Sequence, residues 1–227
     1  MINQLFNISS KEKIEAVEKL LEHSSPSKDF FLMVVLSVLM ATFGLLIDSS
    51  TVIIGSMLIA PILYPILSFA IGITMADFSL SSKAAITLTK AASLSVIIAL
   101  FVTLLFSPSM GNQTKEILER TKPSLISIAV GVTAGLAAAF AMTKPKLNET
   151  LPGIAISVAL IPPLAVVGIG LANLDITMAS NALLLFLINA AGIIFSASII
   201  FSLMNFYSKR EKAIEIIKEE AKEEKKA

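Results

Sequence analysis

The sequence feature that most limits the fold is an uncharged apolar stretch of 28 residues, Ser49–Ala76, enclosed by Asp48 and Asp77. About 20 apolar residues are enough to cross a bilayer as a helix. Pro61 and Pro65 stand near the centre of the stretch, where a proline removes a backbone hydrogen bond and clashes with the preceding turn. Carbonyl groups freed in this way must be sheltered by protein or by a wet cavity. The stretch therefore predicts a membrane segment with a broken helix.

Composition places the chain among the α-helical membrane proteins. Of its 227 residues, 55% are hydrophobic and 15% are charged, whereas about 25% of the residues in soluble domains are charged. The apolar runs are continuous rather than alternating, which argues against an outer-membrane barrel. With no cysteine, one histidine and no catalytic motif, we expect no metal site, no cofactor and no enzyme activity. The net charge of +1 indicates no nucleic-acid partner.

Polar segments flank the apolar region. In residues 1–28, the pattern from Ser9 to Glu12 is a capping box, and it predicts an amphipathic cytoplasmic helix at about 10–23, lying on the membrane face or packed on a neighbour. Residues 208–227 are charged throughout and predict a cytoplasmic helical tail. Residues 29–207 form the membrane domain. Six spanning helices are expected there, at about 30–47, 49–76, 84–106, 123–142, 151–173 and 177–207.

The two halves of the membrane domain resemble each other. The second and fifth apolar segments are both interrupted by prolines, and three short matches keep their order along the chain. We therefore expect an all-α protein with two repeats, at about 30–106 and 123–207. A repeat of three spans must be inverted relative to its copy, a common design of secondary transporters. The matches pair Ala41–Leu45 with Val132–Leu136, Ser56–Pro61 with Ser157–Pro162, and Lys90–Ala92 with Asn189–Ala191, at offsets of 91, 101 and 99 residues.

Charge leaves the topology open. Six spans with a cytoplasmic N-terminus place 14 basic residues inside and 3 outside, as the positive-inside rule requires. If the two proline-broken segments, at about 51–76 and 151–173, are instead re-entrant hairpins, four helices span and the count is again 14 to 3. Length favours crossing, because about 26 residues reach roughly 39 Å as a helix.

The broken segments supply the candidate substrate site. A break exposes carbonyl groups and the ends of half-helices, whose partial charges can hold an ion or a polar solute. The alternative is a plain proline kink, satisfied by neighbouring hydroxyl groups. Ser56 and Ser157 occupy matching positions before the breaks. The proline positions are Pro61, Pro65, Pro162 and Pro163.

Two polar residues and two glycines complete the candidate positions. Lys90 lies within an apolar run, at a cost of roughly 2.5–3.5 kcal/mol, and either reaches back to the inner interface or faces a cavity. Asn189 either joins helices by hydrogen bonds or faces the same cavity. Gly131 and Gly135 are spaced for close helix packing.

Four motifs stand out in the sequence: GSMLIAP at Gly55–Pro61 with Pro65, ERTKP at Glu119–Pro123, GIAISVALIPPLAVVGIG at Gly153–Gly170, and LINAAGI at Leu187–Ile193. On these motifs the chain resembles the uncharacterised hydrophobic domain family (domain of unknown function 389) of bacterial and archaeal integral membrane proteins. The resemblance covers about residues 30–205. It implies a polytopic membrane protein and names no substrate. Ser56 and Ala190 depart from the residues that are usual in the family.

These patterns favour a small inverted-repeat transporter or channel-like protein for a small polar solute or ion. It would lie in the cell membrane as a homo-oligomer, with both termini in the cytoplasm. The alternative is a non-transporting scaffold or sensor that acts through oligomerisation and its cytoplasmic tails. The transporter interpretation requires a polar, water-reachable cavity at the breaks. A closed, dry interior would reject it for that conformation.

Overall fold

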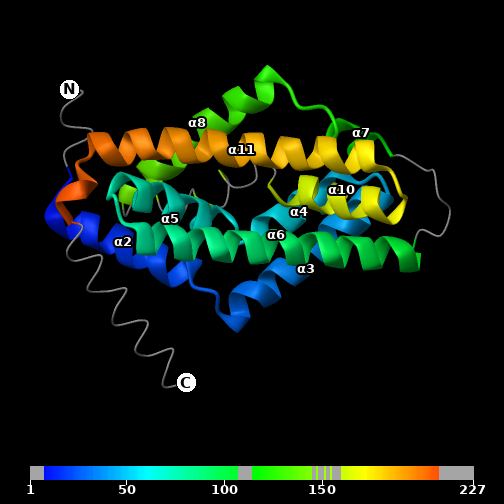
Figure 1. Cartoon of the computed structure of the whole chain (residues 1–227), viewed down its shortest axis with the longest axis horizontal. Helices are drawn as coiled ribbons and strands as arrows, with labels where there is room; N and C mark the ends of the chain where they lie inside the picture. Colours follow the sequence, from blue (N-terminus) through cyan, green and yellow to red (C-terminus); the bar gives the residue numbers. More distant parts are fainter. Residues whose placement is uncertain are drawn as a thin grey trace.

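The structure is a computed structural model that describes residues 8–106, 114–144, 147, 151, 154 and 160–209. All regular secondary structure in these residues is helical (Figure 1). The charged tail, predicted to be helical, lies outside the described residues from residue 210 onward. The helices are α2 (Ser10–Ser24), α3 (Lys28–Leu46), α4 (Ser50–Ile59), α5 (Leu63–Thr74), α6 (Phe78–Phe106), α7 (Lys115–Glu119), α8 (Leu125–Thr143), α10 (Ile161–Ala172), α11 (Ile176–Leu203) and the 3-10 helix η2 (Phe206–Lys209).

Four of the described helices, α3, α6, α8 and α11, are long and apolar enough to cross a membrane. The pair α4 and α5 also passes that test when taken together, which makes up to five spans, but the pair is bent by 51° and fits either a broken span or a re-entrant loop. Helix α10 has 12 apolar residues, and part of the segment before it lies outside the described residues. Six spans therefore stay a prediction.

Helix α2 begins with the capping box that its sequence predicts. The Ser9 hydroxyl accepts a hydrogen bond from the Glu12 backbone N–H at 3.2 Å, and the Ser9 N–H donates to the Glu12 carboxylate at 2.7 Å. The apolar face of α2 is buried against α5. Buried Ser68 of α5 donates to the Leu20 carbonyl at 3.1 Å and to the Ser24 hydroxyl at 3.0 Å. The N-terminal helix is thus packed on the helical core.

Helix α10 is almost completely buried among other helices. Of its 12 residues, 11 are buried, and it packs against α6, α11 and α3. A helix that is apolar on all sides belongs in a protein interior or in a membrane. This continuous burial explains why α10 shows no amphipathic pattern.

Helices α5–α6 and α10–α11 form two hairpins of matching dimensions. Helices α5 and α10 both have 12 residues, and the hairpins begin at Leu63 and Ile161, 98 residues apart. The turns match as well. In the first, the Asp77 N–H donates to the Gly72 carbonyl at 2.9 Å; in the second, the Asp175 N–H donates to the Gly170 carbonyl at 2.8 Å, again 98 residues later.

The residues before the two aspartates adopt the left-handed conformation in both turns, with φ of 51° at Ala76 and 57° at Leu174. Each aspartate then caps the following helix. The Asp77 carboxylate accepts from the Leu80 N–H at 3.1 Å, and the Asp175 carboxylate accepts from the Met178 N–H at 2.8 Å. The two turns thus match at a register of 98 residues, and the turn after α3 has the same form, with φ of 56° at Asp48 and a 2.8 Å bond from the Ser49 N–H to the Gly44 carbonyl.

This register differs from the one that the sequence matches predict. It makes Pro65 equivalent to Pro163 and Ala91 equivalent to Asn189, whereas the matches at offsets of 101 and 99 pair Pro61 with Pro162 and Lys90 with Asn189. Chance alignments are frequent in apolar segments of such limited composition. The repeat and its register therefore stay a prediction.

The two hairpins pack with their positions exchanged. The Ser198 hydroxyl of α11 donates to the Ala70 carbonyl of α5 at 3.3 Å. The residue 98 positions after Ala70 is Gly168, and the residue 98 positions before Ser198 is Leu100. These two also touch, because a Cβ on Gly168 would lie 2.8 Å from the Leu100 backbone nitrogen. Helices α6 and α11 run in opposite directions along the molecule (Figure 1). Reciprocal contacts of this kind are what an approximate two-fold axis produces.

Candidate functional site at the helix breaks

The first break separates α4 from α5 at residues 60–62, and Pro61 lies in it. Pro65 falls within the first turn of α5, where backbone N–H groups have no partner inside the helix, so a proline costs little there. The two prolines that the sequence singles out therefore occupy different positions. Pro61 accompanies the bend, and Pro65 belongs to the start of the next helix.

The second candidate region begins where α10 begins. Pro162 and Pro163 are buried in the first turn of α10, directly after Ile161. Ser157 lies outside the described residues, as do its neighbours from 155 to 159. The structure thus shows a helix that starts at the prolines, and the helix break predicted before it stays a prediction.

The starts of α5 and α10 meet. A cavity of about 10 Å³ lies between them. Ile62 and Leu160, and likewise Leu63 and Ile161, are 98 residues apart, so the cavity lies where equivalent positions of the two hairpins face each other. Its lining residues are Met57, Ala60, Ile62, Leu63, Leu160 and Ile161.

This cavity is not the polar chamber that a transporter site requires. A single water needs about 10–15 Å³ and several polar partners, and all six lining side chains are apolar. Among the described residues, the starts of α5 and α10 therefore leave little space between them, and only apolar side chains face it. The polar, water-reachable cavity that the transporter interpretation requires is not seen among the described residues in this conformation.

A hydroxyl group that was not expected to matter contacts the end of α4. The Ser37 hydroxyl of α3 donates to the Ser56 carbonyl at 2.7 Å, and Ser56 turns its own hydroxyl to the Ile53 carbonyl at 2.6 Å. Both serines are fully buried. The Ser56 carbonyl is among the last four of its helix, which lack partners further along it. Ser37 thus stabilises the helix end before the bend.

The structure does not bring the two predicted polar site residues to the breaks. Lys90 is exposed on the surface of α6. Asn189 is buried in α11, where its backbone lies against Gly131 of α8. Neither side chain lines the cavity between α5 and α10.

Glycines allow α8 and α11 to approach closely. A Cβ on Gly131 would lie 3.1 Å from the Asn189 carbonyl oxygen, and one on Gly135 would lie 2.7 Å from the Ile193 Cα. Gly192 of α11 faces Gly131 in the same way, with 3.2 Å from its Cβ position to the Gly131 carbonyl carbon. Small residues on both helices thus form this contact.

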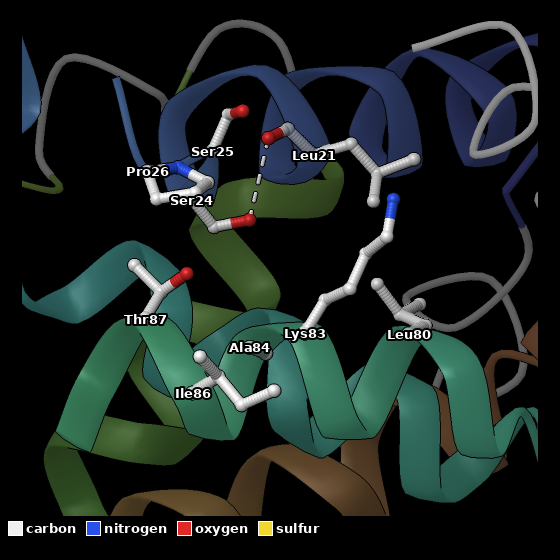
Figure 2. A pocket seen from close by; sticks show the side chains of 9 residues that line it. All are labelled: Leu21, Ser24, Ser25, Pro26, Leu80, Lys83, Ala84, Ile86 and Thr87. Carbon is white, nitrogen blue, oxygen red and sulfur yellow. Dashed lines mark hydrogen bonds between the residues drawn. The ribbon is translucent and has the colours of Figure 1, made fainter. Parts of the chain in front are cut away.

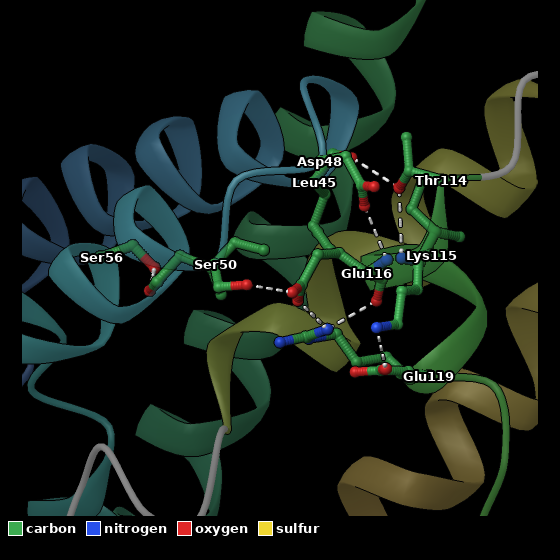
Figure 3. Close-up of polar contacts among 11 residues, drawn as sticks. Leu45, Asp48, Ser50, Ser56, Thr114, Lys115, Glu116 and Glu119 are labelled. Carbon is green, nitrogen blue, oxygen red and sulfur yellow. Dashed lines mark hydrogen bonds and ion pairs between the residues drawn. The ribbon is translucent and has the colours of Figure 1, made fainter.

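A second polar cluster joins α7 to the turn between α3 and α4 (Figure 3). The Thr114 hydroxyl donates to the Leu45 carbonyl at 2.8 Å, and the Glu116 N–H donates to the Asp48 carboxylate at 2.9 Å. The Glu116 carboxylate also accepts from the Ser50 hydroxyl and pairs with Arg120. The side chains of Arg120 and Glu116 are only 16% and 12% exposed.

Sequence reasoning missed this cluster. In the sequence, Asp48 served only as an end of the apolar stretch, and no structure was assigned to the residues between the third and fourth predicted spans. The available signal was the spacing of Glu116 and Arg120, which suits an ion pair one helical turn apart. Nothing in the local pattern indicated that the turn after α3, about 70 residues earlier, supplies the other half of the contact.

The described residues define an all-helical protein with the apolar helices of a membrane-embedded one. The chain belongs to the family described as domain of unknown function (DUF389), whose model matches residues 57–195. It is 34% identical over 176 residues to the uncharacterised protein MJ0678 of Methanocaldococcus jannaschii, and the alignment covers 78% of this chain and 54% of that relative. The chain thus spans about half of the relative's length. No solved structure matches it.

Proposed function

We propose that the chain is a small membrane transporter or channel-like protein for a small polar solute or ion, built as an inverted repeat. The observation that supports this most is the reciprocal packing of the hairpins, in which Ala70 contacts Ser198 and the equivalent Gly168 contacts Leu100. Antiparallel repeats around an in-plane two-fold axis are a common architecture of secondary transporters, whose sites lie where the discontinuous helices of the two halves meet.

In this proposal the described conformation is a closed one. The starts of α5 and α10 enclose about 10 Å³ at the proposed substrate position, so a solute enters only after one hairpin has moved against the other. Rocking of one repeat against the other is the usual route to alternating access. The contact between Ser198 and Ala70 joins the two hairpins and must slide or open during that movement.

A flux assay tests the proposal. The purified chain is reconstituted in liposomes, and gradients of potassium chloride, sodium phosphate and glycerol are followed by stopped-flow light scattering. The chain contains no cysteine, so Ala70→Cys with Ser198→Cys can be oxidised to a disulfide, which a reductant cleaves again. We expect flux of at least one probe, and we expect the cross-link to stop it until the link is cleaved. Flux that continues unchanged in the cross-linked protein would refute movement of the hairpins.

Accessibility of the breaks gives a readout that needs no substrate. A single cysteine at Leu63, which is buried at the cavity, should react with a membrane-impermeant thiol reagent when the closed state opens. Ala182→Cys is the control, because Ala182 is fully buried in α11 and does not line the cavity. If both cysteines stay equally unreactive, the interior is dry in all populated states.

The small apolar cavity also favours the second candidate, a non-transporting scaffold or sensor that acts through its cytoplasmic tails. For this function, deletion of residues 209–227 should abolish activity in the cell while Pro61→Ala leaves it intact. The opposite result rejects the scaffold.

Topology remains part of the proposal, with the cell membrane as location and both termini in the cytoplasm. Cysteines placed at Lys115 and Lys146 can be labelled from either side of the membrane. Six spans place 115 outside and 146 inside, and re-entrant hairpins give the reverse.

We also propose a homo-oligomer, detectable by cross-linking in the membrane. Because Gly131 and Gly135 contact α11 of the same chain, the oligomer must use another face.

A further inference from the structure

One face of α6 carries two lysines for which the described residues offer no partner. Lys83 and Lys90 are seven residues apart, two turns along the same face, and both are exposed. Neither forms a hydrogen bond or ion pair within the part of the chain that the structure describes. A lysine within an apolar segment is costly and tends to mark a function.

A cavity of about 130 Å³ opens beside Lys83, between the end of α2 and the first turns of α6 (Figure 2). Its volume is about ten times what one water needs, and a cavity of this size lined by apolar groups favours an apolar occupant. Its walls are mainly apolar, with hydroxyl groups at the end of α2 and at Thr87. In Figure 2 the Lys83 side chain extends across the opening toward α2. The walls include Leu21, Ser24, Pro26, Leu80, Ile86 and Thr87.

The chain around the cavity has the character of a membrane interface. The turn between α2 and α3 reads SSPSKD over residues 24–29, and its polar backbone and charges require water nearby. Because this turn lines the same cavity as Thr87, water and lipid meet close to this level of α6. From Thr87 to Phe106, the end of α6, the helix extends roughly 29 Å, about the thickness of the hydrocarbon core.

Lys90 can join this site because of the direction in which helical side chains lean. Its Cα lies about 10 Å beyond that of Lys83, and side chains on a helix lean toward the N-terminus. A stem in that direction runs back toward Ile86, one turn earlier, so the ammonium group of Lys90 can reach the interface near the cavity. Two cations and an apolar recess thus converge on one position.

We propose that this position binds an anionic phospholipid of the surrounding bilayer, with its phosphate between Lys83 and Lys90 and part of an acyl chain in the cavity against Ile86. Such a lipid matches the site in both charge and polarity. Basic pockets between membrane helices suit anionic head groups, and the apolar walls suit a lipid tail. The site is separate from the helix breaks and does not depend on transport.

Fluorescence quenching tests the proposal. The chain contains no tryptophan, so Ile86→Trp places a single reporter at the cavity. Ile97→Trp is the matched control, because Ile86 and Ile97 are both 51% exposed and Ile97 lies three turns further along the same face. Each variant is reconstituted in phosphatidylcholine with a small fraction of either chain-brominated phosphatidylglycerol or chain-brominated phosphatidylcholine.

In the Ile86→Trp variant, we expect brominated phosphatidylglycerol to quench the fluorescence several-fold more than brominated phosphatidylcholine does. In the Ile97→Trp variant, the two lipids should quench equally. Lys83→Gln and Lys90→Gln should each lower the preference about fivefold, the equivalent of about 1 kcal/mol for one lysine near a lipid head group. Lys115→Gln, at an exposed side chain of α7, should leave it unchanged.

Three results would overturn the proposal: equal quenching of the Ile86→Trp variant by both lipids, a preference that survives loss of both lysines, and relief of the quenching by soluble glycerol phosphate, which would indicate a site for a free anion. If the tryptophan at position 86 prevents folding, the same comparison can use the unsubstituted chain in detergent. Phosphatidylglycerol should then raise its thermal midpoint more than phosphatidylcholine does, and Lys83→Gln with Lys90→Gln should remove the difference.

Discussion

Addition of one methyl group at Gly135 should separate α8 from α11. A Cβ at this position would meet the Ser196 hydroxyl and would lie 2.7 Å from both the Cα and the carbonyl oxygen of Ile193. A side chain such as Ser196 can rotate away, but backbone atoms of Ile193 move only if the whole helix moves. Gly135→Ala therefore tests whether the close approach of these helices stabilises the fold.

The size of the effect follows from two opposing contributions. Alanine is better than glycine within a helix by about 1 kcal/mol. Overpacking of a tight interior costs about 1–3 kcal/mol, and the upper value applies where the obstacle is backbone. We expect Gly135→Ala to lower the free energy of unfolding by about 2 kcal/mol. Gly131→Ala should cost less, because its Cβ would be 3.1 Å from the nearest atom.

Equilibrium unfolding in mixed micelles measures this prediction. Gly55→Ala is the matched control, because Gly55 also lies within a helix but its Cβ would meet only the Met40 terminal methyl, at 3.5 Å. That variant should be unchanged or stabilised by up to about 1 kcal/mol. If Gly135→Ala proves as stable as Gly55→Ala, the close contact between α8 and α11 is not what supports the fold.

Three further predictions concern contacts outside the long helices. Glu116→Gln leaves the mostly buried Arg120 guanidinium without its charged partner and should cost about 3 kcal/mol, seen as faster hydrogen exchange in α7; unchanged exchange there contradicts it. Ser68→Ala removes both side-chain hydrogen bonds that hold α2 on α5, at about 1 kcal/mol each, and should speed exchange in α2 and leave α8 unaffected. The backbone N–H and hydroxyl of Ser9 hold the pKa of Glu12 below its ordinary 4.5, so the capping contribution is complete above pH 4.5 and is lost as the pH falls through the lower folded-state pKa. Helicity of α2 should decline over that range, and Glu12→Gln, which keeps a side-chain acceptor but does not titrate, should remove this pH dependence.

Much of the local structure could be predicted from the sequence because it depends on neighbouring residues. The capping box at Ser9 and the helix that follows it need only the spacing of a few polar and apolar side chains. The membrane class follows from the length of the uncharged runs. The family membership follows from motifs that surround the prolines, and the family model confirms it over residues 57–195.

The candidate site could be predicted only in part. The sequence singled out Pro61 and Pro162, and the structure does bring the start of α5 to the start of α10. It could not show that the meeting point is small and apolar, because cavity size depends on how Ile62 and Leu160 pack across a gap of 98 residues. Lys90 and Asn189 looked equivalent in sequence, yet one lies exposed and the other is buried against α8.

The sequence by itself determined that this chain is helical, apolar enough for a membrane and interrupted twice by proline, because these properties reside in composition and short-range spacing. Only the tertiary structure decided the matching turns of the two hairpins, the reciprocal contacts of Ala70 and Gly168, and the attachment of α7 to the turn after α3. The reciprocal contacts and the attachment of α7 depend on residues about 70 to 130 positions apart. In apolar segments many pairings satisfy the same pattern, and close packing and hydrogen bonding select one of them.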